Sequence, residues 1–133
     1  MSSPSSLITG VDFVTVFSTD LAAAESFYGG TLGLPRSAVY QRGEDPPMGL
    51  EFETGSLTLS VVRSEAIGIE QRPNKHPLAL HVEDVEAARA ELESRGVAFA
   101  ADTLDTGVCH MAFFEDPDGN ALMLHNRYAP RAA

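Results

Sequence analysis

The chain has 133 residues, 44% of them apolar, which suits a globular protein built as one domain or as two closely joined small modules. No apolar run approaches the length of a membrane span, so no membrane partner is expected. The formal charge of −10 argues against nucleic acid as a partner, and the single cysteine, Cys109, excludes an internal disulfide.

The compartment predicted from these features is the cytoplasm. One cysteine is compatible with a reducing environment. Residues 1–6 are polar and lack the apolar stretch of a secretory signal.

The first half of the chain predicts a strand, a helix and three more strands. The first strand places Phe13, Thr15 and Phe17 on one face, and Asp20 then provides an N-cap for a run of strong helix formers. A turn at Gly55-Ser56 separates the last two strands, which should pair as a hairpin. We expect strands over residues 10–17, 35–41, 49–54 and 57–62 and a helix over residues 21–28.

The second half repeats this order after a polar stretch with Gly, Pro and Asn. Asp84 is the second helix cap, and Gly96 ends that helix. We expect a helix over residues 85–94 and strands over residues 77–82, 97–101, 108–114 and 121–126. The caps Asp20 and Asp84 are as far apart in the sequence as the turn glycines Gly55 and Gly119, which indicates an internal repeat.

The predicted fold is therefore α+β, with two βαβββ modules in tandem. The first module covers residues 7–63, the linker residues 64–75 and the second module residues 76–128. Each sheet should cover one face with its helix and leave the other face curved and free. That concave face is the expected place for a ligand.

The last hairpin turns at Asp-Pro-Asp-Gly-Asn, residues 116–120. Pro117 presets its φ, Gly119 tolerates a positive φ, and Asp and Asn side chains bond to their own backbone. A calcium loop would need further oxygen ligands and a later bidentate Glu, which do not follow here. The motif predicts a turn.

This Phe-x-x-Asp-Pro-Asp-Gly-Asn-x-Leu hairpin, together with the doubled βαβββ order, resembles the vicinal oxygen chelate superfamily over about residues 7–128. That superfamily includes glyoxalase I, extradiol dioxygenases, fosfomycin-resistance enzymes and bleomycin-resistance proteins. The resemblance implies a homodimer, in which the first module of one chain faces the second module of the other and forms a composite cup.

The resemblance also implies where metal ligands would stand in the enzymes of the superfamily. Those positions fall on Phe13, Pro77, Met123 and either Thr58 or Ser60. Phe and Pro have no ligating atom, a thioether suits soft metals, and a lone hydroxyl is a poor ligand. We therefore expect no metal and no other cofactor.

Two histidines leave open the alternative of an unusual metal site. His81 and His125 share the strand parity of the concave face and would meet there, either as pocket residues or around a metal in an unfamiliar arrangement. His110 follows Cys109, but adjacent strand residues face opposite sides, so Cys109 is expected to be a small buried residue.

The residues expected to bind a ligand combine aromatic rings, a thioether and a few hydrogen-bonding groups, which suit a flat and partly polar molecule. They are Phe13, Thr15, Phe17, Tyr40, Met48, Phe52, Thr58, Ser60, His81, His110, Met123 and His125. Because the metal ligands are missing, the chain resembles the bleomycin-resistance branch of the superfamily. That resemblance implies metal-independent sequestration of a bulky aromatic natural product, such as an antibiotic, which would confer resistance without catalysis. The alternative is a lyase, isomerase or dioxygenase that uses His81 and His125.

Overall fold

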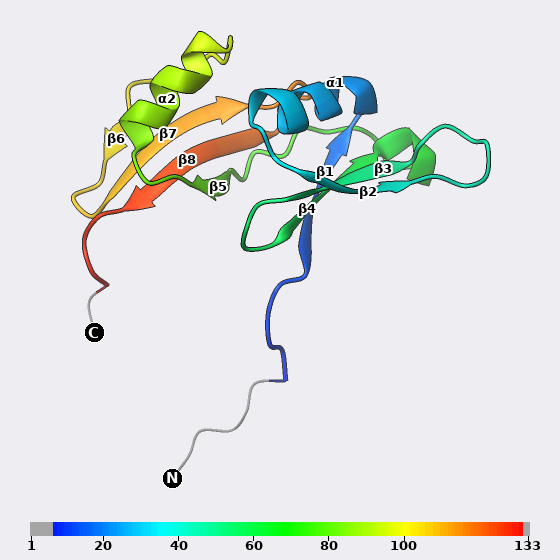
Figure 1. Cartoon of the computed structure of the whole chain (residues 1–133), viewed down its shortest axis with the longest axis horizontal. Coiled ribbons are helices and arrows are strands. Elements are labelled where there is room, and N and C mark those ends of the chain that lie inside the picture. The colour runs from blue at the N-terminus through cyan, green and yellow to red at the C-terminus, as the bar shows by residue number, and fades with distance from the viewer. Residues whose placement is uncertain (1–6, 132–133) are drawn as a thin grey trace.

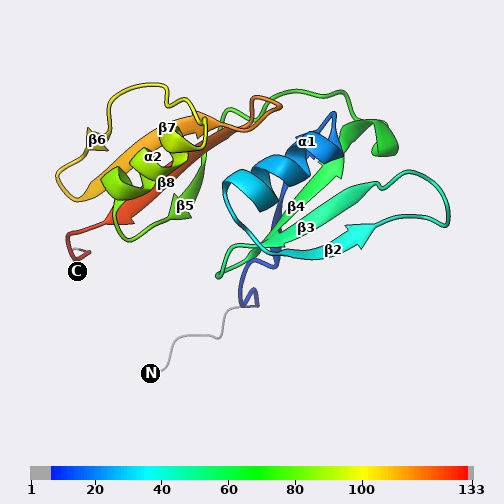
Figure 2. The ribbon, with the colours of Figure 1, turned by 45° about the horizontal axis from the view of Figure 1, so that its top comes forward.

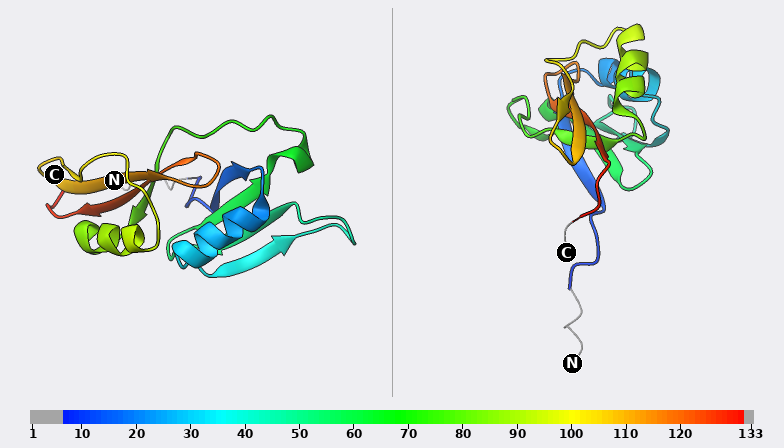
Figure 3. Two further views of the ribbon diagram at one scale, coloured as in Figure 1. Left: turned by 90° about the horizontal axis from the view of Figure 1, so that it is seen from above. Right: turned by 90° about the vertical axis from the view of Figure 1, so that its left-hand side faces the viewer.

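The computed structural model describes residues 7–131 and shows two α/β modules side by side (Figure 1). The first contains β1 (Phe13–Ser18), α1 (Leu21–Glu25), η1 (Ser26–Thr31), β2 (Arg36–Tyr40), β3 (Gly49–Glu53) and β4 (Thr58–Arg63). The second contains β5 (Leu78–His81), α2 (Val85–Ser94), β6 (Leu104–Asp105), β7 (Cys109–Glu115) and β8 (Ala121–Arg127). A 3₁₀ turn, η2 (Ser64–Ile67), opens the linker between them, which crosses to β5 as an extended segment (Figure 3).

Both sheets have four strands and the same topology, β1-β4-β3-β2 and β5-β8-β7-β6. The first strand of each module pairs in parallel with the last, and the other neighbours are antiparallel. The predicted repetition of a βαβββ unit is confirmed.

The helices of the two modules lie on the same side of the sheets, which leaves the opposite faces free (Figures 1 and 2). Alternation along the strands sorts the side chains between these faces. On β1, Val16 is 2% exposed beneath the helix, whereas Phe13 points to the free side and is 55% exposed. The same split on β8 buries Leu122 and Leu124 and leaves Met123 and His125 half-buried on the free side.

Each helix begins at the predicted aspartate. Asp20 accepts hydrogen bonds from the backbone N–H groups of Ala22 and Ala23, and Asp84 accepts one from Ala87. The second helix ends at Ser94, as predicted, and Gly96 follows with a φ of +93°. The first helix instead widens into the π-helical turn η1, which carries Phe27 and Tyr28 into the core.

The Asp-Pro-Asp-Gly-Asn turn joins β7 to β8 and also fastens the two modules together. Within the turn, Asp116 Oδ1 accepts from the N–H groups of Asp118 and Asn120. Across the modules, Asn120 Nδ2 donates to Phe17 O at 2.9 Å, and Thr19 donates through N and Oγ1 to Asp118 Oδ1 at 2.9 and 2.6 Å. The predicted turn is confirmed, and its side chains act across the junction as well as locally.

One predicted strand is wrong. Residues 97–101 form no strand. Ala100 N–H bonds to Phe113 O of β7, and the Phe99 ring packs on Phe114 with centroids 5.1 Å apart. The edge of this sheet is β6, which pairs through Leu104 and Asp105 with β7. Within residues 7–131, no helix is both long and apolar enough to cross a membrane.

Candidate functional site

The free face of the first sheet carries most of the predicted binding residues. The parallel ladder sets Phe13 beside Thr58 and Thr15 beside Ser60, while Phe17 lies one pair further along, next to Val62. Phe13 and Thr15 are exposed, Phe17 and Thr58 are half-buried, and Ser60 is buried. An exposed ring beside hydroxyl groups is suited to stacking on a flat molecule that also carries polar atoms.

The free face of the second sheet brings the two predicted histidines next to each other. His81 pairs with His125 across β5 and β8, and Met123 pairs with Ala79 two residues earlier. His81 Nε2 lies 3.1 Å from Glu83 Oε1, and its side chain is 66% exposed.

Sequence reasoning missed two residues of this face. Met111 pairs with His125, and Phe113 pairs with Met123, so both stand on the free side of β7. The alternation along residues 108–114 places Met111 and Phe113 on the same face of the strand. The alternation alone does not show which of the two faces the helix leaves free.

Tyr40 and Met48 line a shallow hollow of about 280 Å³ with Arg42, Gly49 and Val62. Tyr40 and Gly49 are paired across β2 and β3, and Gly49 in turn pairs with Val62. The Tyr40 hydroxyl donates to Glu51 Oε2 at 3.1 Å, and this bond raises the pKa of Tyr40. Tyr40 and Met48 therefore lie together at the far edge of the first free face.

Two predicted binding residues are on the wrong face. Phe52 is fully buried under the helix, with its ring 5.9 Å from that of Tyr28, because it alternates with Glu51 and Glu53. His110 alternates with Cys109 and lies on the helix side of β7, where Nε2 is 3.4 Å from Asp105 Oδ2 and the ring is 4.8 Å from Tyr128.

Cys109 is buried, which agrees with the prediction that it is a small buried residue. Its sulfur lies 3.9 Å from Arg127 Nη1, and its side chain points away from the face of His110. A Cys–His nucleophilic pair is therefore not formed between these neighbours.

The positions of the superfamily's metal ligands do not fit a hard metal ion in this chain. The ladders pair Ser60 with Thr15 and Met123 with Ala79, so Ser60 and Met123 occupy equivalent places in the two modules. A hydroxyl and a thioether at these places, with Phe13 at the start of β1, supply neither carboxylate nor imidazole. Over the part of the chain that the structure describes, no group of three or more His, Cys, Asp or Glu side chains is placed to hold a metal ion.

The carboxylates of this face are engaged with neighbouring side chains. Glu53 accepts from the Ser37 hydroxyl at 2.5 Å and from the Thr58 hydroxyl at 2.9 Å, and these two bonds lower the pKa of Glu53. The first sheet therefore presents a negative charge beside an exposed aromatic ring, an arrangement that attracts cationic aromatic compounds.

The fold is a pair of βαβββ modules whose free faces carry aromatic and hydroxyl side chains. The family comparison agrees with this class: the model of the Glyoxalase/Bleomycin resistance protein/Dioxygenase superfamily matches residues 10–124. The chain belongs to this superfamily.

Two similar proteins and one structure of the same fold are compared with the chain. The uncharacterized protein YaeR of Escherichia coli is 30% identical over 129 residues, covering 88% of this chain and 95% of that protein. The antibiotic binding protein TnmS3 of Streptomyces sp. CB03234 is 28% identical and covers 92% of this chain and 99% of its own, with a TM-score of 0.75. Lactoylglutathione lyase of Agrobacterium tumefaciens, at 16% identity and a TM-score of 0.72, covers 89% of this chain and 93% of its own and shares the fold.

Proposed function

We propose that this protein sequesters a bulky aromatic small molecule, such as an antibiotic, without a metal and without chemical change to the ligand. Binding would protect the cell by stoichiometric capture. The observation that carries the proposal is the exposed ring of Phe13. Phe13 occupies the position at which metal enzymes of the superfamily have a metal-ligating side chain. Similarity to the antibiotic binding protein TnmS3 along nearly the whole chain supports the same reading.

The proposed contacts divide between the two sheets. Phe13 and Phe17 would stack on the aromatic part of the ligand, and Thr15 and Thr58 would bond to its polar atoms. Met123 and His125 would come from the second sheet, with Met111 and Phe113 beside them. The carboxylates Glu51 and Glu53 on β3 favour a ligand with a positive charge.

A homodimer is part of this proposal. In one chain no helix covers the free face of either sheet (Figure 1), and a facing module from a second copy would enclose the ligand between two sheets. Enclosure would raise the buried area of the ligand toward the fraction usual for small-molecule sites. Light scattering at several protein concentrations measures the oligomeric state directly.

The first test is a thermal-melt screen of the purified protein against two panels, one of divalent metal ions and one of aromatic antibiotics. A ligand at about a hundred times its Kd stabilises the folded state by roughly 2.7 kcal/mol, which is a shift of several degrees for a chain of this length. A shift with an aromatic compound and none with metals is expected. Stabilisation by one metal alone would contradict the proposal.

A second candidate function is catalysis by a lyase, isomerase or dioxygenase centred on His81 and His125. The direct pairing of these residues and the contact of His81 with Glu83 favour it, because a carboxylate beside an imidazole supports general base action. Stoichiometry separates the two functions. After incubation with excess compound and denaturation, a binding protein returns the compound with unchanged mass, whereas an enzyme returns product.

A further inference from the structure

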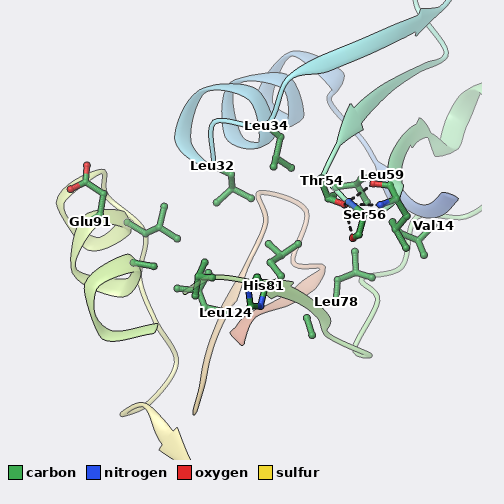
Figure 4. A pocket seen from close by; sticks show the side chains of 16 residues that line it. Val14, Leu32, Leu34, Thr54, Ser56, Leu59, Leu78, His81, Glu91 and Leu124 are labelled. Carbon is green, nitrogen blue, oxygen red and sulfur yellow. Dashed lines mark hydrogen bonds between the residues drawn. The ribbon is translucent and has the colours of Figure 1, made fainter. Parts of the chain in front are cut away.

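A second hollow lies between the modules, on the helix side of the sheets, and is lined by residues of both modules (Figure 4). Its volume is about 370 Å³, within the range of small-molecule sites. One wall comes from the first module and the other from β5 and α2 of the second.

The lining of this hollow is aliphatic. Its floor is buried and includes Leu59, Leu92 and Leu124, and the half-buried side chains of Val14, Leu78 and Leu80 surround it. The lining contains no Phe, Tyr or Trp side chain, and His81 is its one ring-bearing residue. This separates it from the free face of the first sheet, which carries the rings of Phe13 and Phe17.

Polar groups stand at the rim. Thr54 and Ser56 lie at one end, where their hydroxyl oxygens are 3.4 Å apart, and Glu91 lies at the other, on α2 (Figure 4). Glu91 pairs with Arg95 through Oε1 at 3.1 Å. A hydroxyl on a ligand finds a partner in Ser56, because the Thr54 hydroxyl already donates to Leu57 O and accepts from Leu57 N–H. A carboxylate instead meets Glu91 and the overall charge of −10.

We propose that this intermodule hollow binds an aliphatic molecule with an uncharged polar head, of the class of a medium-chain or terpenoid alcohol. An apolar cavity of this kind offers a water molecule few hydrogen-bond partners. An apolar ligand therefore displaces only weakly bound water. The guest covers side chains from both modules at once. It therefore stabilises their relative position at the end of the junction opposite the Asp116–Asn120 turn.

The site is independent of the proposed aromatic site. Leu80 points into the hollow and Phe13 to the free face, so a variant at one position leaves the other site intact. His81 lies on the edge strand where the two regions meet and is left unaltered in the test.

The experiment titrates the full-length protein with n-octanol, n-octylamine and octanoate by calorimetry and by thermal melting. Leu80→Trp fills the hollow, and Val39→Trp places the same ring at a position on β2 that is 40% exposed. Octanol is expected to bind the wild type and Val39→Trp alike, to bind Leu80→Trp at least tenfold more weakly, and to bind more tightly than octanoate.

The chain has no other tryptophan, so fluorescence reports whether each variant is folded as designed. Emission from Leu80→Trp should lie at shorter wavelength than emission from Val39→Trp. If circular dichroism shows that Leu80→Trp is unfolded, Ala88→Phe fills the hollow from the α2 wall and takes its place.

Three results would overturn the proposal. They are no binding of octanol to the wild type, equal affinity in the filled and control variants, or binding of octanoate as tight as that of octanol. Dissociation of an oligomer by octanol would show that a second copy of the chain fills the hollow, and this result also rejects a small-molecule site.

Discussion

The Tyr28 hydroxyl donates a hydrogen bond of 2.7 Å to Asp116 Oδ2 and so joins the helical segment of the first module to the β7–β8 turn of the second. Both residues are buried, with Tyr28 fully enclosed and Asp116 only 7% exposed. A carboxylate at this depth is tolerated because Asn120 Nδ2 and two turn N–H groups also donate to it. The junction between the modules is therefore specified by polar contacts in addition to apolar packing.

Replacing Tyr28 with Phe removes the hydroxyl and leaves Asp116 with one donor fewer in a buried place. We expect the free energy of unfolding to fall by about 1–3 kcal/mol, measured by urea denaturation. Tyr128→Phe is the matched control, because Tyr128 is 49% exposed while its hydroxyl bonds to Asp105 at 2.7 Å. Loss of the exposed bond should change stability by less than about 0.5 kcal/mol. Equal effects would mean that the Tyr28 bond has no special role.

The raised pKa of Tyr28 predicts that the free energy of unfolding falls at alkaline pH. Burial, then the charge of Asp116 and its hydrogen bond, raise the pKa of Tyr28 from the ordinary value of 10.0. Above that pH the unfolded chain loses the phenol proton and the folded chain keeps it, so unfolding releases a proton and stability falls as pH rises. The slope attributable to Tyr28 is about 1.4 kcal/mol per pH unit.

Comparison of the wild type with Tyr28→Phe isolates this contribution, because the other alkaline groups are common to both proteins. The difference between their unfolding free energies should shrink above about pH 10. A constant difference through that range would show that Tyr28 ionises equally in both states.

Asn120 is another polar residue of the junction, and a charged replacement at this position tests how much its hydrogen bonds contribute to stability. Its Nδ2 donates to Phe17 O and Asp116 Oδ2, and its Oδ1 accepts from Asn74 N–H. Asn120→Asp keeps the shape but replaces the donor with a second carboxylate, so we expect a loss of at least about 2 kcal/mol at neutral pH.

Repulsion from Asp116 raises the pKa of the new carboxyl in the folded state, so its protonation should restore part of that loss as the pH falls below neutral toward about 4. Asn126→Asp is the control, because the Asn126 amide is half-buried and donates to Val82 O without a carboxylate partner. A pH-independent loss in Asn120→Asp would indicate a packing effect instead of a charge effect.

Local signals in the sequence predicted the elements well. Asp84 and Gly96 bracket α2 because capping and a positive φ depend on neighbours in the chain, and the predicted bounds match. Widening of α1 into η1 was not predicted, since Gly29 and Gly30 read simply as helix terminators. The prediction of a strand over residues 97–101 was wrong because β-branched and aromatic residues also occur in loops that pack against a core.

Long-range contacts account for what the sequence did not predict. Tyr28 and Asp116 are 88 residues apart, and no local pattern pairs them. Phe52 and His110 were expected to bind the ligand but lie on the helix side, because alternation identifies two sets of side chains without saying which set the helix covers. The intermodule hollow depends on how the two sheets are placed, which neither half encodes alone.

Phe13 gives the sharpest test of the proposed function. Its ring is 55% exposed at the start of β1, so Phe13→Ala should leave the protein folded while removing a stacking surface. Loss of one buried aromatic contact should cost about 1.5–3 kcal/mol of binding free energy, roughly 10- to 150-fold in Kd for the aromatic compound found in the screen. Val39→Ala truncates a similarly exposed residue on the helix side of β2 and should bind as the wild type does. Unchanged affinity in a folded Phe13→Ala protein would remove this ring from the site and leave the His81–His125 surface as the place to search.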